Sequence, residues 1–515
     1  MQDPLAMQAA ANPTKAAVIE DDRELDFATF DALTNRYANT LIDLGVQAGT
    51  KIVWCGRNST EVVAIVAAAR KAGAVAVPLN YRLTPDEAAY VVDNSDATMV
   101  LFDAEQTDQL AKAAEQVERV HTWAAFRCEP VEVPGWARHL DQLTAEASED
   151  QPTPVGEDEV AGSAMFYTSG TTGHPKGVVR GAISTDLLLG IVQEIGFQPD
   201  DVYLTTGPLY HSGPQAFMQI TQLLGGTVVV MRRFEPERWL ELVEHHGITT
   251  TFSAPTPIRR VVDLPDEVIS RYDTSSMQRM VANAAPWPFD LKRRYVEKIG
   301  DDSLFEVYGS TELGIDTILR PEDQMRKPGS CGRPSPGIEL ALFDEHGEQV
   351  TEPHVAGDLY VRGEAVLKTY YKADQKLKDS SLGDWVTVGD VAYVDEEGYY
   401  YICDRRTDMI ISGGMNIYPA EIEAVLMAHP KVEDVAVFGI PSDEWGEQVH
   451  ATISVYDGEP VDDGELDAHC REHLASYKAP RSYERIDEIP RNPSGKVLKR
   501  QLRDPFWEGH DRKVG

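Results

Sequence analysis

The sequence predicts an α/β fold in which a large N-terminal domain of layered α/β subdomains and a β-rich subdomain precedes a small α+β C-terminal domain. Strand and helix patterns alternate over the first hundred residues, which is typical of parallel strands covered by helices. Short strands broken by Gly and Asp fill residues 338–401. A compact unit of helices and strands occupies the last hundred residues, after the polar run DRRTD at residues 404–408.

The first hundred residues carry the clearest local signals. Apolar side chains recur at helical spacing up to Gly45, which ends the first helix. The run TPDE at residues 84–87 predicts a capping box with Pro at the first helical position. Helices are predicted over residues 30–44, 58–73 and 84–93, and strands over residues 51–55, 74–79 and 98–102.

The remaining segments are predicted from composition and spacing. Residues 128–160 are rich in Glu, Pro and Asp and predict a surface connection, after which α/β segments resume near Ala164 and continue into the 330s. In the last hundred residues a helix begins at Pro419, and strands are predicted over residues 435–440 and 449–455. Leu466, Cys470 and Leu474 lie four residues apart and predict a further helix.

Composition and charge exclude several classes of protein. Of the 515 residues 26% are charged and 42% hydrophobic, which is ordinary for a globular chain and excludes disorder as the dominant state. The net charge of −36 would repel a nucleic-acid backbone, so nucleic acid is not expected as a partner. A phosphate-bearing ligand therefore requires a local basic patch. Such a patch is sufficient, because salt screens the net field within about 8–10 Å.

Cysteine usage and hydropathy bear on the compartment. The five cysteines form no CxxC pair, so neither a disulfide framework nor a zinc site is expected. No secretory signal is visible, and the longest apolar run, residues 62–69, is too short to span a bilayer. We therefore expect a cytoplasmic protein that is not integral to a membrane, and we leave a homodimer open.

The strongest chemical signal is the run YTSGTTGHPKGV at residues 167–178. Small hydroxyl residues between glycines let the backbone approach a ligand and turn N–H and O–H donors onto one anion. Lys176 adds a positive charge. The spacing does not match a Walker A loop, so we predict a phosphate-binding loop of another kind between two buried strands.

This run resembles the phosphate-binding signature of the adenylate-forming superfamily, which includes acyl-CoA synthetases, adenylation domains of peptide synthetases and firefly-type luciferases. Further motifs resemble the family in its own order, over nearly the whole chain from about residue 10 to 503. They are YGSTE (308–312), KPGSCGRP (327–334), GDW with TVGD (383–390), DR (404–405), GGMNIYPAEIE (413–423) and PRNPSGK (490–496).

The resemblance implies a reaction in two steps. A carboxylate attacks the α-phosphate of ATP to give an acyl-adenylate and pyrophosphate, and a thiol, usually that of coenzyme A, then displaces AMP. The implied phosphate contacts are Thr168, Ser169, Gly170, Thr171, Thr172, Gly173 and Lys176. The resemblance also implies a catalytic role for Thr172. Glu312 stands at the family's Mg²⁺-ligand position and is likewise implied to be catalytic.

The nucleoside contacts are also implied by the resemblance. Tyr308 matches the ring that stacks on adenine, within a motif that includes Gly309 and Thr311. Asp390 matches the carboxylate that accepts the ribose hydroxyls, and Arg405 a ribose and phosphate contact. The segment 281–288 stands where many relatives read Gly-Gly-Ala-Pro. Its Ala284, Ala285 and Pro286 would pack along adenine, whereas Asn283 and Trp287 depart from that pattern.

The resemblance further implies a moving C-terminal domain. Lys496 resembles the catalytic lysine that pairs with the substrate carboxylate during adenylation. In the second step the Gly413-Gly414 loop replaces it and lines the tunnel for the CoA thiol. We therefore divide the chain into an N-terminal domain (1–404), a hinge (405–408) and a mobile lid domain (409–515). Thr407 stands where relatives commonly carry Asp or Lys as the pivot.

The sequence limits the chemical class of the acyl substrate but does not identify one acid. Tyr210 and His211 stand where amino-acid-activating relatives carry an Asp for the substrate ammonium, so we expect a carboxylic acid without an amine: fatty, aryl or polycyclic. His211 is expected to gate the pocket or touch the acyl group, and a core histidine is the alternative.

The acceptor is expected to be coenzyme A, with Arg232, Arg233, Lys478 and Arg481 as candidate partners of its phosphates. The main alternative is an acyl-AMP ligase that loads a separate carrier protein, since nothing resembling a carrier domain follows Lys496 in the sequence. A non-catalytic binding homologue is a remote alternative, because Lys496, Glu312 and the Thr171-Thr172 pair are all kept. A light-emitting oxidase would carry the same motifs and is also remote.

Overall fold

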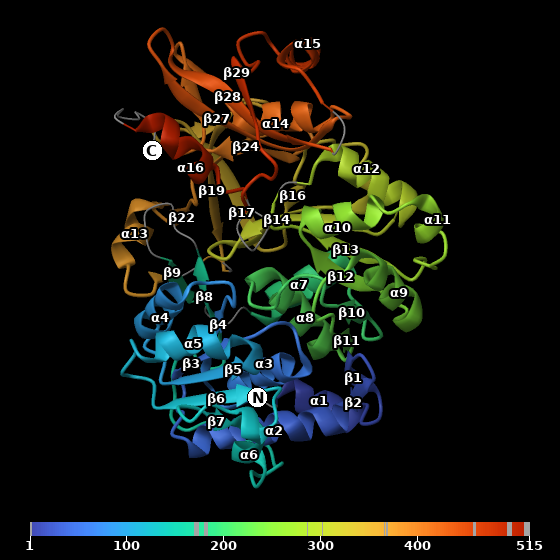
Figure 1. Cartoon of the computed structure of the whole chain (residues 1–515), viewed down its shortest axis with the longest axis vertical. Coiled ribbons are helices and arrows are strands. Elements are labelled where there is room, and N and C mark those ends of the chain that lie inside the picture. The colour runs from blue at the N-terminus through green and yellow to red at the C-terminus, as the bar shows by residue number, and fades with distance from the viewer. Residues whose placement is uncertain are drawn as a thin grey trace.

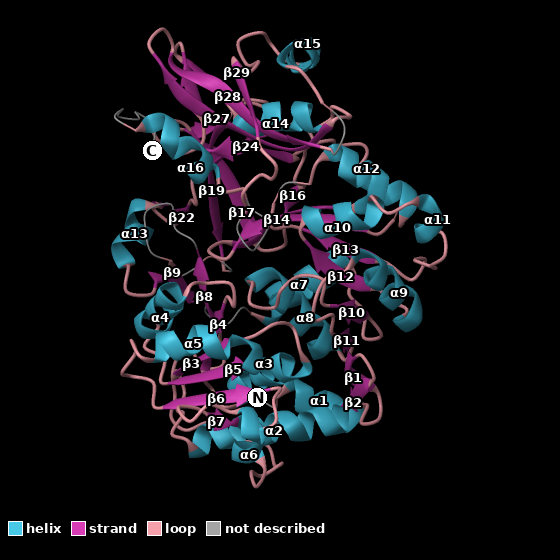
Figure 2. Ribbon diagram, in the orientation of Figure 1, coloured by secondary structure: helices cyan, strands magenta, loops and turns pink. Residues whose placement is uncertain are grey.

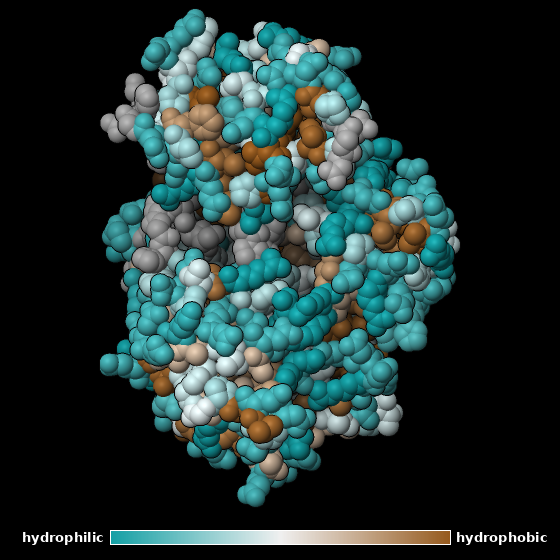
Figure 3. All heavy atoms as spheres, in the orientation of Figure 1, coloured by the Kyte–Doolittle hydropathy of each residue, from teal (hydrophilic) through white to brown (hydrophobic). Residues whose placement is uncertain are grey.

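The computed structural model describes residues 3–168, 175–179, 184–285, 287–300, 302–364, 366, 369–456, 460–491 and 497–508. Two helix-covered sheets lie at one end of the molecule and the C-terminal unit at the other, with the β-rich part between them (Figures 1 and 2). Figure 3 shows a face that is mostly hydrophilic, as the charge of the chain leads one to expect. Within the described residues, no helix combines the length and apolar character needed to cross a bilayer.

The first sheet is the parallel one that the alternating pattern predicts. Its strand order is β4-β3-β5-β6-β7. One face carries Ile52 and Trp54 into a core with α2 and α3, and the other carries Val53 and Phe102 into a core with α4 and α5. The elements are α2 (Phe27–Asp43), β3 (Lys51–Cys55), α3 (Thr60–Lys71), β4 (Val75–Leu79), α4 (Pro85–Asn94), β5 (Met99–Asp103), α5 (Thr107–Ala114), β6 (Thr122–Phe126), β7 (Arg138–His139) and α6 (Leu140–Thr144).

The sequence signals in this region are confirmed, with one correction. Thr84 and Glu87 form the predicted capping box at the start of α4. Residues 128–160 are not only a surface connection, because they contain β7 and α6. His139 and Leu140 are buried there, since β7 adds a fifth strand to the sheet and α6 closes its edge.

The second sheet has nine strands in the order β16-β15-β14-β13-β12-β10-β11-β1-β2. Its central six strands are parallel, and helices cover both faces. The elements are α1 (Pro4–Ala11), β1 (Ala16–Glu20), β2 (Arg23–Asp26), α7 (Thr185–Ile195), β10 (Val202–Leu204), α8 (Ser212–Leu224), β11 (Thr227–Val229), α9 (Pro236–His246), β12 (Thr250–Ser253), α10 (Pro255–Val262), α11 (Asp266–Ile269), β13 (Arg279–Ala282), α12 (Phe289–Lys298), β14 (Leu304–Ser310), β15 (Gly314–Leu319) and β16 (Arg333–Pro334).

A small antiparallel sheet joins these two layers to the β-rich part. It consists of β8 (Met165–Thr168), β9 (Lys176–Val179) and β20 (Thr369–Tyr370), in the order β20-β9-β8. Ala164, just before β8, bridges to Ala76 of β4. The segment that enters the glycine-rich run therefore continues from the first sheet.

The predicted β-rich subdomain is a seven-stranded sheet with one short helix. Its pairings are antiparallel, and its core includes Leu342, Leu359 and Ala392. The elements are β17 (Ile338–Phe343), β18 (Gln349–Val350), β19 (Gly357–Gly363), α13 (Asp374–Asp379), β21 (Ser381–Leu382), β22 (Trp385–Val386), β23 (Asp390–Val394) and β24 (Tyr400–Arg405).

The C-terminal unit has its own sheet and its own core, which includes Ile422, Leu426 and Val437. Its first strand begins five residues after β24 ends, so the two sheets are joined by a short connection. The elements are β25 (Ile410–Ser412), β26 (Met415–Ile417), α14 (Pro419–Met427), β27 (Val432–Ser442), β28 (Gly446–Val455), α15 (Asp463–His473), β29 (Ser482–Arg485) and α16 (Lys499–Arg503).

Candidate active site

The candidate site lies along the carboxyl edge of the nine-stranded sheet. Because β10, β12, β13 and β14 are parallel, the loops that follow them emerge at the same edge. Ligands of open α/β sheets bind in the crevice outside the carboxyl ends of the strands. The loops bring His211, Ala284 and Thr311 to this edge from distant parts of the sequence.

The two ends of the glycine-rich run are fixed by the hairpin of β8 and β9, in which Thr168 pairs with Lys176. Thr168 Oγ1 donates a hydrogen bond of 2.9 Å to Glu312 Oε1. The phosphate-loop prediction and the metal-ligand prediction therefore meet at one point, although 144 residues separate the two side chains in the sequence. The predicted contacts Ser169, Gly170, Thr171, Thr172 and Gly173 lie outside the described residues.

Glu312 fits a site for Mg²⁺ that is completed by phosphate oxygens. Among the residues described, no group of three or more His, Cys, Asp or Glu side chains gathers to hold a metal on its own. Mg²⁺ is usually bound through one or two carboxylates together with substrate phosphates. A single carboxylate beside the phosphate loop matches that arrangement.

The residues predicted to contact the nucleoside are brought together between two subdomains. Tyr308 at the end of β14 donates a hydrogen bond of 2.5 Å to Asp390 at the start of β23. Arg405 at the end of β24 pairs with the other oxygen of Asp390 at 3.3 Å. Burial, reinforced by the Asp390 carboxylate, raises the pKa of Tyr308 well above its ordinary value, so its hydroxyl stays a donor at neutral pH.

Gly309 and Thr311 continue from Tyr308 into the turn of the β14–β15 hairpin. A side chain at Gly309 would collide with the carbonyl of Gly314, which explains the glycine. Thr311 Oγ1 lies 3.0 Å from Ser212 Oγ in the first turn of α8. The metal-ligand motif therefore contacts the segment predicted to line the acyl pocket.

The segment after β13 is strained at Ala284. Its φ is +71°, a left-handed conformation that normally favours glycine. Asn283 bridges this turn, since its Nδ2 donates to the Val307 carbonyl and its Oδ1 accepts from the backbone N–H of Ala284. Ala285 is half-buried beside this turn, and Pro286 lies outside the described residues. Trp287 does not shape the pocket, because it is buried in the core beside Tyr295.

Tyr370 is a candidate site residue that the sequence does not identify. It lies buried on the two-residue strand β20. Burial and the Glu312 carboxylate raise its pKa, and Arg405 opposes the shift, so the ring lies near both groups. No motif signal identifies a tyrosine on so short a strand.

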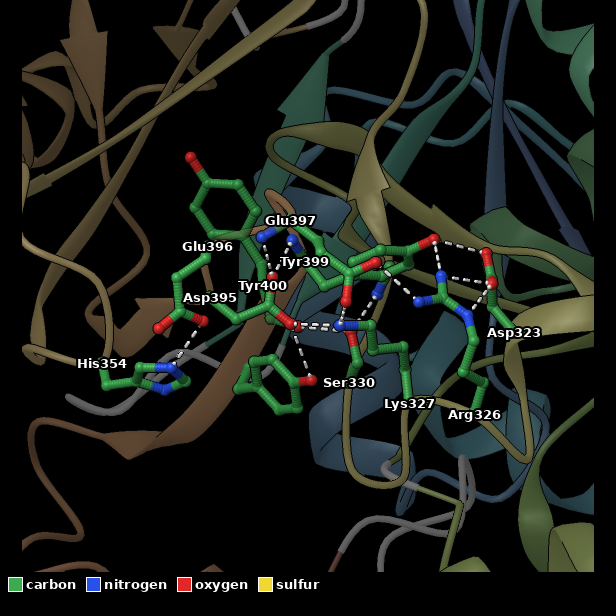
Figure 4. A network of polar contacts seen from close by, with 12 residues as sticks. Asp323, Arg326, Lys327, Ser330, His354, Asp395, Glu396, Glu397, Tyr399 and Tyr400 are labelled. Atoms are coloured by element: carbon green, nitrogen blue, oxygen red, sulfur yellow. Dashed lines mark hydrogen bonds and ion pairs between the residues drawn. The ribbon is translucent and has the colours of Figure 1, made fainter.

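A polar network holds the tip of the β23–β24 hairpin (Figure 4). The open end of this hairpin carries Asp390 and Arg405. Lys327 Nζ contacts Asp395 at 2.8 Å and Glu397 at 2.5 Å. Arg326 contacts Glu397 at 2.6 Å, and Tyr399 donates to Asp323 at 2.6 Å. The motif at residues 327–334 thus anchors the strand that leads to the predicted hinge.

The connection between β24 and the C-terminal unit is flanked by ion pairs. Asp404 Oδ2 accepts a hydrogen bond of 3.0 Å from the Ala420 N–H and lies 3.9 Å from Lys499 Nζ. Lys499 also pairs with Glu423 at 2.9 Å. Helix α16 thus contacts the residue at the head of the predicted hinge.

Lys496 lies outside the described residues, but its neighbours are placed. Arg491 and Val497 form a β-bridge, and Arg491 pairs with Asp434 at 2.7 Å. The adjacent Glu433 accepts a hydrogen bond of 2.7 Å through its carbonyl from Arg259 of α10. This part of the C-terminal unit therefore contacts the large N-terminal part.

Gly413 and Gly414 form the two-residue turn between β25 and β26, with φ values of +58° and +82°. Two positive φ values are typical of the tight hairpin turns in which glycine is preferred. The Gly413 N–H donates to the Trp445 carbonyl at 2.8 Å. The Arg481 guanidinium lies 4.6 Å from the Trp445 ring centre.

The candidate phosphate partners for CoA differ in their contacts. Arg232 is engaged by Asp103 at 2.8 Å, and Arg233 is 3.4 Å from Glu105. Lys478 is held by both oxygens of Glu421. Arg481 has no acidic partner in the part of the chain that the structure describes, so no ion pair competes there with a ligand for its guanidinium.

Comparison with known proteins decides the family. The model for AMP-binding enzymes matches residues 5–371, and the model for the C-terminal domain of these enzymes matches residues 421–496. The chain belongs to the AMP-binding enzymes. These are the adenylate-forming superfamily, so the predicted family and fold class are confirmed, with a large N-terminal and a small C-terminal part.

Three relatives of this AMP-binding enzyme illustrate its branch. Fatty acid–[acyl-carrier-protein] ligase ScoC of Streptomyces coeruleorubidus is 32% identical, over 99% of this chain and 97% of its own. Feruloyl-CoA synthase of an Amycolatopsis species is 34% identical over 97% of both chains. The structure of o-succinylbenzoate CoA synthetase from Bacillus subtilis with its acyl-adenylate superposes with a TM-score of 0.84, at 29% identity, over 100% of this chain and 99% of that one. Family and relatives indicate an AMP-forming ligase.

Proposed function

We propose that the protein is an ATP-dependent acyl-CoA synthetase. A carboxylate oxygen attacks the α-phosphorus of ATP, the bond to the β-phosphate breaks, and acyl-AMP and pyrophosphate form. The thiol of CoA then attacks the acyl carbon, loses its proton, and expels AMP. The proposal depends most on two sets of contacts near the carboxyl edge of the nine-stranded sheet. Thr168 contacts Glu312, and Asp390 contacts both Tyr308 and Arg405.

In the first step, we assign the glycine-rich run and Lys176 to the phosphates of ATP. Asp390 accepts the ribose hydroxyls, Tyr308 stacks on adenine, and Arg405 contacts ribose and phosphate. Glu312 would hold Mg²⁺, which neutralises part of the triphosphate charge when it is bound. Lys496 is assigned to the substrate carboxylate, where its ammonium offsets negative charge as the new bond forms.

For the second step, we propose that residues 409–515 rotate as a lid on a hinge at residues 405–408, relative to residues 1–404. The contacts of Asp404 with Ala420 and Lys499 cross this hinge, so rotation must break them. The Gly413-Gly414 turn would then replace Lys496 at the site and line the tunnel for the thiol. Its lack of side chains leaves room for a narrow pantetheine arm.

Coenzyme A is the acceptor that the surface beside this turn favours. Trp445 is 36% exposed, and Arg481 lies against its ring. An indole face supports stacking of an adenine ring, and a guanidinium binds phosphate. A carrier protein presents the pantetheine arm without the nucleotide, so it would not use this surface. The alternative that a carrier protein is the acceptor is supported by the likeness to ScoC. A homodimer and a cytoplasmic location stay predictions.

The test is the nucleotide product, measured by chromatography with ATP, Mg²⁺ and a panel of carboxylic acids, with and without CoA. AMP that appears with one acid and rises with CoA supports the proposal. AMP that stops near one equivalent per enzyme despite CoA, and resumes with a pantetheine-loaded carrier protein, favours the carrier alternative. ADP as the product contradicts an adenylate mechanism.

A further inference from the structure

Two polar groups in the loop after β10 are buried without partners. Tyr210 is 5% exposed, and its hydroxyl has no hydrogen-bond partner within the described structure. The Nε2 atom of His211 is likewise shielded from solvent and unpartnered there. The two rings lie 4.4 Å apart, centre to centre. Native proteins pair the large majority of such groups, so two adjacent exceptions require a reason.

These two groups lie beside the reacting end of the site. His211 precedes the first turn of α8, where Ser212 contacts Thr311 at 3.0 Å. Thr311 is next to Glu312, which accepts the hydrogen bond from Thr168. Tyr210 and His211 therefore lie two residues and one residue before Ser212, whose side chain contacts the motif that contains Glu312.

The walls around the pair differ in polarity. Gly213 lets α8 approach the ring of Phe252, because a Cβ there would collide with it. Phe252 in turn stacks on Phe217 at 5.6 Å, and both rings are buried, so this wall is apolar.

A second group of side chains, next to Tyr210, is aromatic and cationic. Tyr81 meets Tyr210 edge to face at 5.4 Å and accepts a hydrogen bond of 3.3 Å from Arg57. Arg57 is paired with Glu105 at 3.0 Å. Arg82, 5.7 Å from the Tyr81 ring centre, has no acidic partner in the described ranges, so the field on this side is positive.

Burial, reinforced by Arg82, lowers the pKa of His211 to about 4, so the imidazole is neutral at pH 7. A neutral imidazole and a phenol can each donate one hydrogen bond. The positive field favours a partner atom that is electron-rich. An unsubstituted hydrocarbon chain in this place would leave both groups unpaired.

We propose that the acyl part of the substrate carries an oxygen, as a hydroxyl, keto or second carboxyl group, that hydrogen-bonds with Tyr210 Oη and His211 Nε2. This inference rests on the proposed function and narrows its substrate class to oxygen-substituted acids. The apolar wall of Phe252 and Phe217 then accommodates the hydrocarbon part.

The test uses pairs of acids that differ by one oxygen: a phenolic acid and its dehydroxylated analogue, a keto acid and its saturated analogue, and a dicarboxylic acid and its monocarboxylic analogue. Acid-dependent pyrophosphate release gives kcat/KM for each. We expect the oxygenated member of at least one pair to be favoured by about tenfold or more, because a site built to bind an oxygen rejects the analogue that lacks it.

Tyr210→Phe should lower kcat/KM for the favoured acid by about tenfold or more and leave that of its analogue within about twofold. Tyr203→Phe is the matched control, since Tyr203 is a buried tyrosine whose hydroxyl is satisfied by the Pro214 carbonyl at 3.0 Å. That control should leave the preference between the two acids unchanged.

Two results would overturn the inference while sparing the proposed function. One is turnover of deoxygenated acids at rates equal to or above those of their partners. The other is an equal loss for both acids in Tyr210→Phe. An absence of acid-dependent pyrophosphate release with every acid would instead reject the proposed function, and this inference with it.

Discussion

The hydroxyl of Tyr308 donates a 2.5 Å hydrogen bond to Asp390, across the boundary between the nine-stranded sheet and the β-rich subdomain. The two residues are 82 positions apart in the sequence. The proposed nucleoside site is therefore assembled from two subdomains, and its geometry depends on how the β23–β24 hairpin is held.

Asp390→Asn tests this arrangement. The change keeps the size of the side chain but removes the charge that Arg405 faces and that would accept the ribose hydroxyls. Because hydrogen bonds to charged groups contribute about 1.5–3 kcal/mol, KM for ATP should rise about tenfold to hundredfold. Initial rates of pyrophosphate release at varied ATP measure it. An unchanged KM would remove Asp390 from the nucleoside site.

Lys496→Ala separates the two half-reactions. Loss of the ammonium should lower adenylation by about a hundredfold or more, since electrostatic groups of this kind contribute about 10²–10³ in kcat. Thioester formation from a supplied acyl-adenylate and CoA should stay close to the normal rate, because the proposed rotation of the lid removes the lysine from the site before that step. Single-turnover assays of each step measure both. Equal loss in the two steps contradicts the assignment.

Arg481→Ala probes the proposed nucleotide surface for CoA. KM for CoA should rise about tenfold, in line with one charge-assisted hydrogen bond, while pyrophosphate release without CoA stays unchanged. Pantetheine, which lacks the nucleotide, should show no difference between variant and parent. Arg471→Ala is the control, because Arg471 is an exposed arginine on α15 that pairs with Asp467 at 2.7 Å. If both variants behave alike, Arg481 does not bind CoA.

Lys499 is predicted to stabilise the C-terminal unit through Glu423. Burial raises the pKa of Glu423, so that carboxylate depends on its partner to stay charged. The side chains of Lys499 and Glu423 are 14% and 21% exposed. Lys499→Met should therefore lower the free energy of unfolding by less than the roughly 3–5 kcal/mol that removing one member of a fully buried pair costs. Adding Glu423→Gln should recover most of the loss in denaturant titrations. Additive losses would show that the two side chains are not coupled.

Much of the fold was predictable because its signals are local. The capping box at Thr84 and Glu87 and the double-glycine turn at Gly413 each depend on a few adjacent residues. The family motifs also predict Tyr308, Asp390 and Arg405 as site residues, and the side chains of Tyr308 and Arg405 both contact Asp390.

Other features depend on contacts between residues far apart in the sequence. Lys327 and Asp395 are 68 positions apart, and neither residue predicts its partner. Trp287 follows the segment predicted to pack along adenine, yet the direction of its side chain places it in the core. Tyr370 joins the site only because β20 pairs with β9. Such positions require the tertiary structure.

The central claim is that the enzyme forms an acyl-adenylate, and exchange of labelled pyrophosphate into ATP tests it most directly. The measurement uses ATP, Mg²⁺ and an acid substrate identified from the panel, with no CoA present. The account predicts exchange that requires the acid and is lost in Lys496→Ala. An acid that is converted to its CoA thioester without supporting any exchange would contradict the account.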